Sequence, residues 1–262
     1  MKKHIKIIKY YFKMNLSSAL EYRASFISQA FGMALSNSTF IFFWWIAFSH
    51  VGGQIAGYSF NDVMFIWAVS SSGFGLAFVL FANVASLSQM IVTGELDSLL
   101  LQPCNTLINL ICSKTNLSAY GDFAYGIILM GIVFRGSGAA WLWFAAGLLC
   151  CCLLMTAILL IANSLAFYVG DAASAARIIT ELMINMSIYP DRVYGPPVRA
   201  LMYSVIPVGF AVHIPMRMLN GEPAILAIAS LAGSILFCAI AARVFYHGLK
   251  RYESGNLINM RQ

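Results

Sequence analysis

Two carboxylates followed by a row of leucines are the residues of this sequence whose types and spacing best suit a defined task. The stretch 93–103 holds a glycine, two acids, leucines at helical spacing and a final proline, at Gly94, Glu95, Leu96, Asp97, Leu99, Leu100 and Pro103. Carboxylates suit the first turn of a helix because they oppose the positive end of its dipole, and a proline ends a helix. We therefore expect a short amphipathic helix that acts as a docking element.

Ionisable side chains inside long apolar stretches form a second group of candidates. Arg177 and Glu181 are four residues apart, so they share a helix face and can form an ion pair. An ionisable group within a membrane is a functional candidate by default. The pair lies near the end of its apolar stretch and is expected to be structural. Asp122 lies deeper, and structural hydrogen bonding and a role in a transport path both stay open for it.

Patterns that carry catalysis or bind metals are missing from the sequence. It has no GxxxxGK[ST] phosphate loop, no HExxH and no GxSxG motif. The four histidines are scattered, and none of the six cysteines forms a CxxC pair, so the cysteines are expected to be small buried hydrophobes. The chain is predicted not to be an enzyme, to bind no metal or other cofactor, and not to bind ATP itself.

Composition indicates that the elements positioning these residues lie in a lipid bilayer. Of the 262 residues, 60% are hydrophobic and 10% are charged, whereas a soluble domain has about a quarter charged residues. The net charge of +6 does not indicate nucleic acid, because five of the sixteen Lys and Arg lie among apolar residues within the first thirteen positions. This pattern is typical of a segment at a membrane surface.

The predicted fold is all-α: one polytopic domain, 1–262, with six membrane-spanning helices. Crossing the hydrocarbon takes about 20 residues, and the apolar runs that suit this length lie at 24–48, 62–87, 115–134, 139–169, 172–188 and 223–245. Residues 1–23 place apolar and lysine side chains on different sides of a helix, which predicts an amphipathic helix in the membrane interface. An unstructured leader is the alternative. The docking stretch falls within 88–106, between two spans.

Prolines interrupt residues 189–222, so this segment is expected to be neither a plain helix nor a plain loop. Its part 201–212 is too short to span and too apolar for water, which favours a re-entrant segment shielded by protein. Lys and Arg counts near the spans set the orientation: twelve fall on the side of the termini and four on the other. Both termini and Glu95 are therefore predicted on the cytosolic side of the cytoplasmic (inner) membrane.

The second span combines small residues with a row of aromatic ones. Small side chains at 68–77 allow helices to approach closely in lipid, which predicts tight packing. Phe74, Phe78 and Phe81 share a face beside them, where they either line a hydrophobic cavity or face lipid. Met183 and Met186 in the fifth span are likewise adaptable apolar liners or plain packing residues.

Two motifs of the sequence, about a hundred residues apart, resemble the signatures of a known family. The sequence IVTGELDSLLLQP at 91–103 resembles the GELD…L…P signature of ABC-2-type permeases, the membrane subunits of ATP-binding-cassette exporters. Tyr189-Pro190 followed by IPVGF at 206–210 resembles a second signature of the same family, a Tyr-Pro pair followed by an IPVAF-like stretch. The resemblance covers essentially the whole chain. Cys104-Asn105 stands where such chains often have Asn-Pro, which is a minor departure.

The resemblance implies that two permease chains, identical or paired with a related one, form the path as a dimer. Two separate cytosolic ATPase subunits would bind ATP and Mg. The ATPase-coupling residues would be Gly94, Glu95, Leu96, Asp97 and Leu100. The substrate path would include Phe74, Phe78, Phe81, Asp122, Met183 and Met186. The outer gate would include Tyr189, Pro190, Pro207 and Phe210.

Two other functions remain as alternatives to an exporter subunit. An ion-coupled secondary carrier would need a midplane ion site, and the apolar stretches offer few ionisable groups for one. A non-transporting membrane assembly protein would have no path at all. Membrane lipid is an expected partner in each case, and the apolar candidate liners favour an amphipathic substrate for the exporter.

Overall fold

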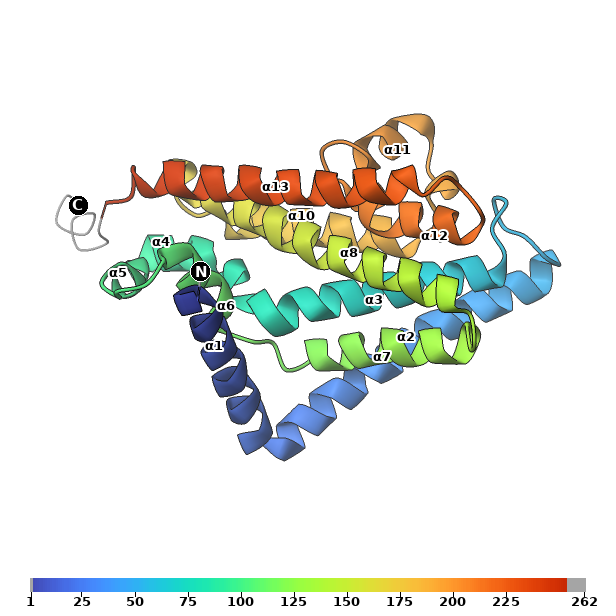
Figure 1. Cartoon of the computed structure of the whole chain (residues 1–262), viewed down its shortest axis with the longest axis horizontal. Helices are drawn as coiled ribbons and strands as arrows, with labels where there is room; N and C mark the ends of the chain where they lie inside the picture. Colours follow the sequence, from blue (N-terminus) through green and yellow to red (C-terminus); the bar gives the residue numbers. More distant parts are fainter. Residues whose placement is uncertain (1, 254–262) are drawn as a thin grey trace.

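The computed structural model describes residues 2–253, and the side chains from residue 6 onward, as a set of helices in which the long ones run side by side (Figure 1). The long helices are α1 (Lys2–Glu21), α2 (Arg23–Val51), α3 (Phe60–Phe81), α7 (Ala119–Val133), α8 (Gly138–Ser164), α10 (Ala173–Ile188) and α13 (Ile225–Leu249). Short helices connect them: η1 (Ala82–Ser86), α4 (Leu87–Thr93), α5 (Leu96–Leu100), α6 (Thr106–Cys112), α9 (Ala166–Val169), η2 (Asp191–Val193), α11 (Pro196–Met202), η3 (Gly209–His213) and α12 (Ile214–Leu219). The prediction of an all-α fold is confirmed over this range.

Four helical stretches are apolar and long enough to cross a membrane: Arg23–Val51, Phe60–Thr93, Gly138–Val169 and Ile225–Leu249. The chain is a multi-pass membrane protein. The other two predicted spans correspond to the shorter α7 and α10, of 15 and 16 residues, so the count of six crossings stays a prediction. Helix α7 begins later than the predicted 115 because the Asn116 side chain accepts the Ser118 N–H, at 3.0 Å, and closes a turn ahead of the helix.

Helix α3 lies at the centre of the bundle and packs closely against α7 and α8. A Cβ atom added at Gly75 would lie 2.5 Å from the backbone nitrogen of Phe123, and one at Gly126 would lie 2.4 Å from the Ala68 carbonyl oxygen. The Ser71 hydroxyl donates to the Asp122 carbonyl at 2.8 Å. Glycine and serine let the two backbones meet, which confirms the tight packing predicted from the small residues.

Helices α2 and α13 lie at the periphery and keep large apolar side chains on the surface. Phe31 of α2 is 68% exposed and Ile228 of α13 is 65% exposed. Apolar surface of this extent suits a hydrocarbon solvent, where it carries no penalty.

Two ends of the bundle differ in what they carry. One, here named the α5 end, holds α1, α4, α5, α6 and the last described residues after α13 (Figure 1). The other, named the α11 end, holds the 52–59 loop after α2 together with α11 and α12. The first and last described residues, Lys2 and Glu253, therefore both lie towards the α5 end.

Helix α1 corresponds to the predicted amphipathic helix 1–23. It packs on α6 through a side with Asn15 and Ala19 buried, and the Asn15 amide donates to the Cys112 carbonyl at 3.0 Å. Ile8 and Phe12, on the predicted apolar side, are 40% and 43% exposed, so the protein leaves this side free for lipid. That α1 lies in the membrane interface stays a prediction.

Residues 189–222 form the broken helical segment that the prolines predict. Pro196 begins α11, Pro207 precedes η3, and Pro215 lies in the first turn of α12. A proline is tolerated at a helix start because the first N–H groups have no partner there. Whether the segment enters the membrane stays a prediction.

Candidate functional site

The predicted docking stretch forms a corner between α4 and α5. Gly94 ends α4 in the left-handed region, at φ +78°, which a glycine adopts without strain. Leu96 and Leu99 are buried, at 0% and 7% exposure, and hold α5 against the bundle. Glu95 is exposed beside them. The corner is therefore a rigid turn with a charged outer edge.

One predicted docking residue needs correction. Leu96 is fully buried within the chain, so its side chain supports the corner and is not presented to a partner. The exposed leucines are Leu100, at 40%, and Leu101, at 86%. Helical spacing predicted a row of leucines but not which of them the bundle would cover.

Side-chain hydrogen bonds connect the corner and its neighbours to three long helices. The Ser88 hydroxyl on α4 accepts the Ala172 N–H at 3.0 Å, just before α10. Asn105, the N-cap of α6, accepts from the Tyr246 hydroxyl of α13 at 2.9 Å. Together with the bond from Asn15 on α1 to α6, these contacts attach the corner and α6 to the bundle.

Asp97 also belongs to this set of contacts. Burial, followed by the neighbouring Asp97 carboxylate, raises the pKa of Tyr252 to about 12, so Tyr252 stays a neutral phenol. Tyr252 follows α13, and its proximity relates Asp97 to the C-terminal end of that helix. Asp97 is half-buried, whereas Glu95 is exposed, so the two predicted carboxylates are not equivalent.

Three of the predicted path residues meet at one cavity. It has a volume of about 240 Å³ and lies between α2, α3, α7 and α10, and its walls include Phe74, Phe78 and Asp122. It extends along α3 from Phe78 to Trp67 and also reaches Ile188, the last residue of α10. Phe78 also borders a second cavity, of about 320 Å³, near Arg177.

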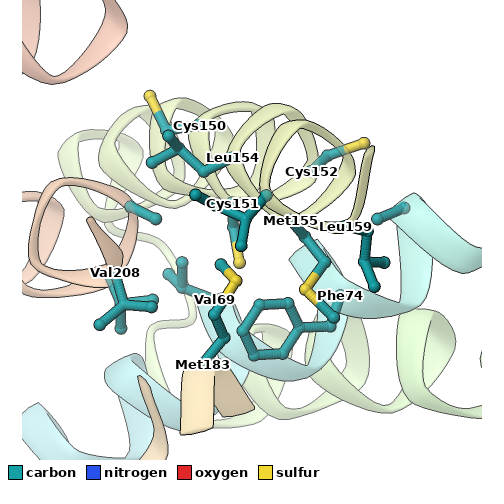
Figure 2. Close-up of a cluster of buried hydrophobic side chains, with 14 of the residues drawn as sticks. Val69, Phe74, Cys150, Cys151, Cys152, Leu154, Met155, Leu159, Met183 and Val208 are labelled. Atoms are coloured by element: carbon teal, nitrogen blue, oxygen red, sulfur yellow. The ribbon is translucent and has the colours of Figure 1, made fainter. Parts of the chain in front are cut away.

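The other predicted path residues lie elsewhere. Met183 and Met186 are buried, at 1% and 8% exposure, and neither lines the cavity. Figure 2 shows Met183 beside Phe74, Cys151 and Met155 in a packed cluster. This arrangement corresponds to the second possibility considered above, a plain packing role. Phe81 is half-buried and packs against the same core without lining the cavity.

Asp122 has a single side-chain partner. The Asn37 amide of α2 donates to its Oδ1 at 2.7 Å. Its Oδ2 has no hydrogen-bond partner among the described residues and is not enclosed by protein. The carboxylate therefore keeps half of its hydrogen-bonding capacity for something that the cavity admits.

The predicted outer-gate residues form part of the α11 end. Tyr189 packs edge-on against Phe40 and Trp44 of α2, at ring-centre distances of 5.7 and 6.0 Å. Pro190 and Pro207 are buried, and Phe210 meets the Tyr203 ring at 5.9 Å. Tyr189 thus joins the end of α10 to α2, whereas the ring contact of Phe210 lies within the broken segment.

A buried carboxylate network at this end was not predicted. Asp191 is 0% exposed and accepts hydrogen bonds from the hydroxyls of Tyr58 and Tyr203, the latter at 2.8 Å. It also forms an ion pair with Arg217, whose Nη2 lies 2.7 Å from Oδ2. These partners come from the 52–59 loop, from the chain after α11 and from α12, so one carboxylate joins three segments.

The electrostatics of the network keep Asp191 ionised. Burial opposes ionisation, but the hydrogen bond from Tyr58, the nearby His213, the hydrogen bond from Tyr203 and the charge of Arg217 together outweigh it and lower the pKa of Asp191 to about 2. Burial and the Asp191 carboxylate in turn raise the pKa of the Tyr58 phenol. The one available signal in the sequence was an acid directly after Tyr189-Pro190, in a segment that also carries arginines.

Groups that could hold a metal ion were not predicted, and none occurs among residues 2–253. All six cysteines are free, and Cys150, Cys151 and Cys152 are buried in the cluster of Figure 2. The Arg177–Glu181 pair is present at 4.0 Å, with both side chains mostly exposed. The pair therefore lies on the exposed surface of α10 and is not part of a buried site.

Comparison with known proteins gives one family. The model of a family described as "ABC-2 family transporter protein" matches residues 34–255, which is most of the chain. A search of curated proteins finds no match. The matched range includes the corner, the Asp191 network and every residue that lines the cavity except Met33.

Proposed function

The chain belongs to the ABC-2 family of transporter proteins, and from this premise we propose that it is the permease of an exporter whose α4–α5 corner is the coupling helix. A permease subunit of this family works with a separate ATPase. In this proposal two cytosolic ATPase subunits carry the ATP and Mg, and two permease chains, identical or related, form the path. Both termini and the α5 end lie on the cytosolic side of the inner membrane.

The observation that carries the proposal is the construction of the corner. Its inner leucines are buried, while Glu95 and Leu101 project outward from the same short helix region. A rigid support with a charged edge and an exposed apolar side chain suits docking, because a few well-placed anchors supply most of an interface's affinity. Leu101 replaces Leu96 as the apolar anchor in this proposal.

The contacts of the corner supply a route from ATP to the path. Closure of the ATPases draws the two docked corners together and shifts the permease pair between two states. The bond from Ala172 to Ser88 passes this displacement to α10, which carries the cavity residues Ile184 and Ile188. Helix α10 leads directly into Pro190 and Asp191, so the same movement reaches the proposed outer gate.

Co-purification of the ATPase with the tagged permease tests this proposal. The variant Glu95→Lys with Leu101→Ser is expected to reduce the co-purified ATPase at least about tenfold, because it reverses the charge and removes the apolar anchor. The matched control is Glu222→Lys, which reverses an exposed acid beyond α12 at the α11 end.

Undiminished association in the corner variant would contradict the proposal. A loss that is equal in the corner variant and in Glu222→Lys would contradict it as well, because the two sites lie at opposite ends of the bundle. Solute transport that withstands ATP depletion but stops with an ionophore would favour the secondary carrier instead.

A further inference from the structure

We propose that the cavity between α2, α3, α7 and α10 binds an amphipathic organic cation, with the Asp122 carboxylate as the counter-charge. The inference rests on the proposed function in one respect, that the bound molecule is the transported one. The cavity, its charge and its hydrogen-bonding groups carry the binding itself.

Within the described part of the chain, the cavity contains an acid and no basic side chain to compensate it. Among the described residues that line it, Asp122 is the one ionisable side chain, and none is Lys, Arg or His. An ionisable group inside a membrane protein usually pairs with another charge or serves a function. Asp122 has only the neutral amide of Asn37, so the cavity presents a carboxylate without a cation.

Three serine hydroxyls of the cavity present acceptors. The Ser70 hydroxyl donates its hydrogen to the Ser187 carbonyl at 3.1 Å, and the Ser71 hydroxyl donates to the Asp122 carbonyl. The Ser118 hydroxyl donates to the Asn116 side chain at 2.8 Å. A hydroxyl has one hydrogen, so these three serines offer lone pairs to a ligand. Trp67 and Asn116 add N–H donors to the wall, but both are neutral, so the Asp122 side chain is the group that favours a cation over an anion.

The remaining wall is apolar and aromatic. Trp67, Phe74 and Phe78 line one side, on α3. Aromatic faces attract organic cations, and quaternary ammonium groups in particular. The volume of about 240 Å³ admits a molecule with one ring and one small cationic head. The aromatic wall thus suits the lipophilic body of the ligand, and Asp122 suits its cationic head.

An isosteric pair of ligands isolates the charge. The probes are benzyltrimethylammonium and neopentylbenzene, which have the same shape and differ by nitrogen in place of carbon. Equilibrium dialysis against the purified full-length chain in lipid nanodiscs gives the ratio of their affinities, with empty nanodiscs subtracted. We expect the cation to bind at least about tenfold more tightly than the neutral probe, because the attraction acts in a site of reduced dielectric.

Variants of Asp122 assign this preference to the carboxylate. Asp122→Asn keeps the shape and the bond with Asn37, and it should remove the preference while leaving the binding of the neutral probe unchanged. Asp122→Glu keeps the charge and should keep the preference. Glu181→Gln is the matched control, because it removes one negative charge from an exposed position that does not line this cavity.

Equal binding of the two probes to the unaltered chain would overturn the proposal, as would a cation preference that survives in Asp122→Asn. Should Asp122→Asn lose both probes, Asp122→Glu decides: a restored preference supports the proposal, and its absence overturns it. Cation binding by a chain that fails the ATPase test would leave the site standing and contradict only the proposed function.

Discussion

Two aspartates in the interior of this protein have opposite surroundings. Asp191, at the α11 end, is fully buried and is contacted by Tyr58, Tyr203 and Arg217. Asp122, in the first turn of α7, is half-buried, and its carboxylate accepts a hydrogen bond from the Asn37 side chain alone among the described residues. The first carboxylate has its charge balanced within the chain. The second has no counter-charge among the described residues.

With the cation site proposed above, this difference separates a structural acid, Asp191, from a ligand-binding one, Asp122. A buried ion that is paired and hydrogen-bonded holds segments together, and its removal leaves its partners unsatisfied. A carboxylate that faces a cavity with one oxygen unpaired costs free energy in the resting protein, and a protein retains such a cost where a ligand offsets it. The two residues therefore predict opposite responses to substitution.

The largest effect is expected at Asp191, whose carboxylate finds all of its partners within the chain. Asp191→Ala leaves the buried Tyr58 phenol, the half-buried Tyr203 phenol and an arginine without their acceptor, and it should lower the free energy of unfolding by about 3–5 kcal/mol. Unfolding by SDS in mixed micelles measures this change. The control Glu222→Ala removes an exposed acid from the same end and should stay within about 0.5 kcal/mol. Similar values for the two variants would show that the network does not hold the α11 end together.

A smaller change in stability is expected when the pH is lowered. The pKa of Asp191 is lowered to about 2 in the folded chain, against about 3.9 in an unfolded one. Its contribution to stability is therefore complete above about pH 4 and is lost as pH falls towards 2. The stability difference between the unaltered chain and Asp191→Asn should be constant from pH 7 to 5 and should shrink by about 2 kcal/mol near pH 2. A difference that already shrinks between pH 6 and 5 would contradict the lowered pKa.

Local sequence predicted those features that depend on neighbours along the chain. The small residues around Gly75 predicted the close contact of α3 and α7, and the spacing at 93–103 predicted the helical corner. The prolines predicted the breaks in 189–222. Each of these features follows from backbone sterics or helical periodicity within a few residues.

Features that depend on distant segments were missed. Tyr58 lies 133 positions before Asp191 and Arg217 lies 26 positions after it, so no local pattern marks them as partners. Periodicity also cannot tell which side of a helix the bundle covers. For this reason Leu96 was assigned to the partner surface although it is buried, and Met183 was a candidate liner although it packs in the core.

The smallest and most discriminating effect is expected at Asp122. Asp122→Asn keeps an oxygen for the Asn37 amide and removes a carboxylate that has no counter-charge. The free energy of unfolding should therefore stay the same or rise by up to about 1 kcal/mol, because functional sites are commonly held at a cost in stability. The same SDS titration measures the change, beside Asp191→Asn as the paired comparison. A fall of more than about 2 kcal/mol, in the range of a broken buried interaction, would place Asp122 with Asp191 among the structural acids and remove the distinction between the two sites.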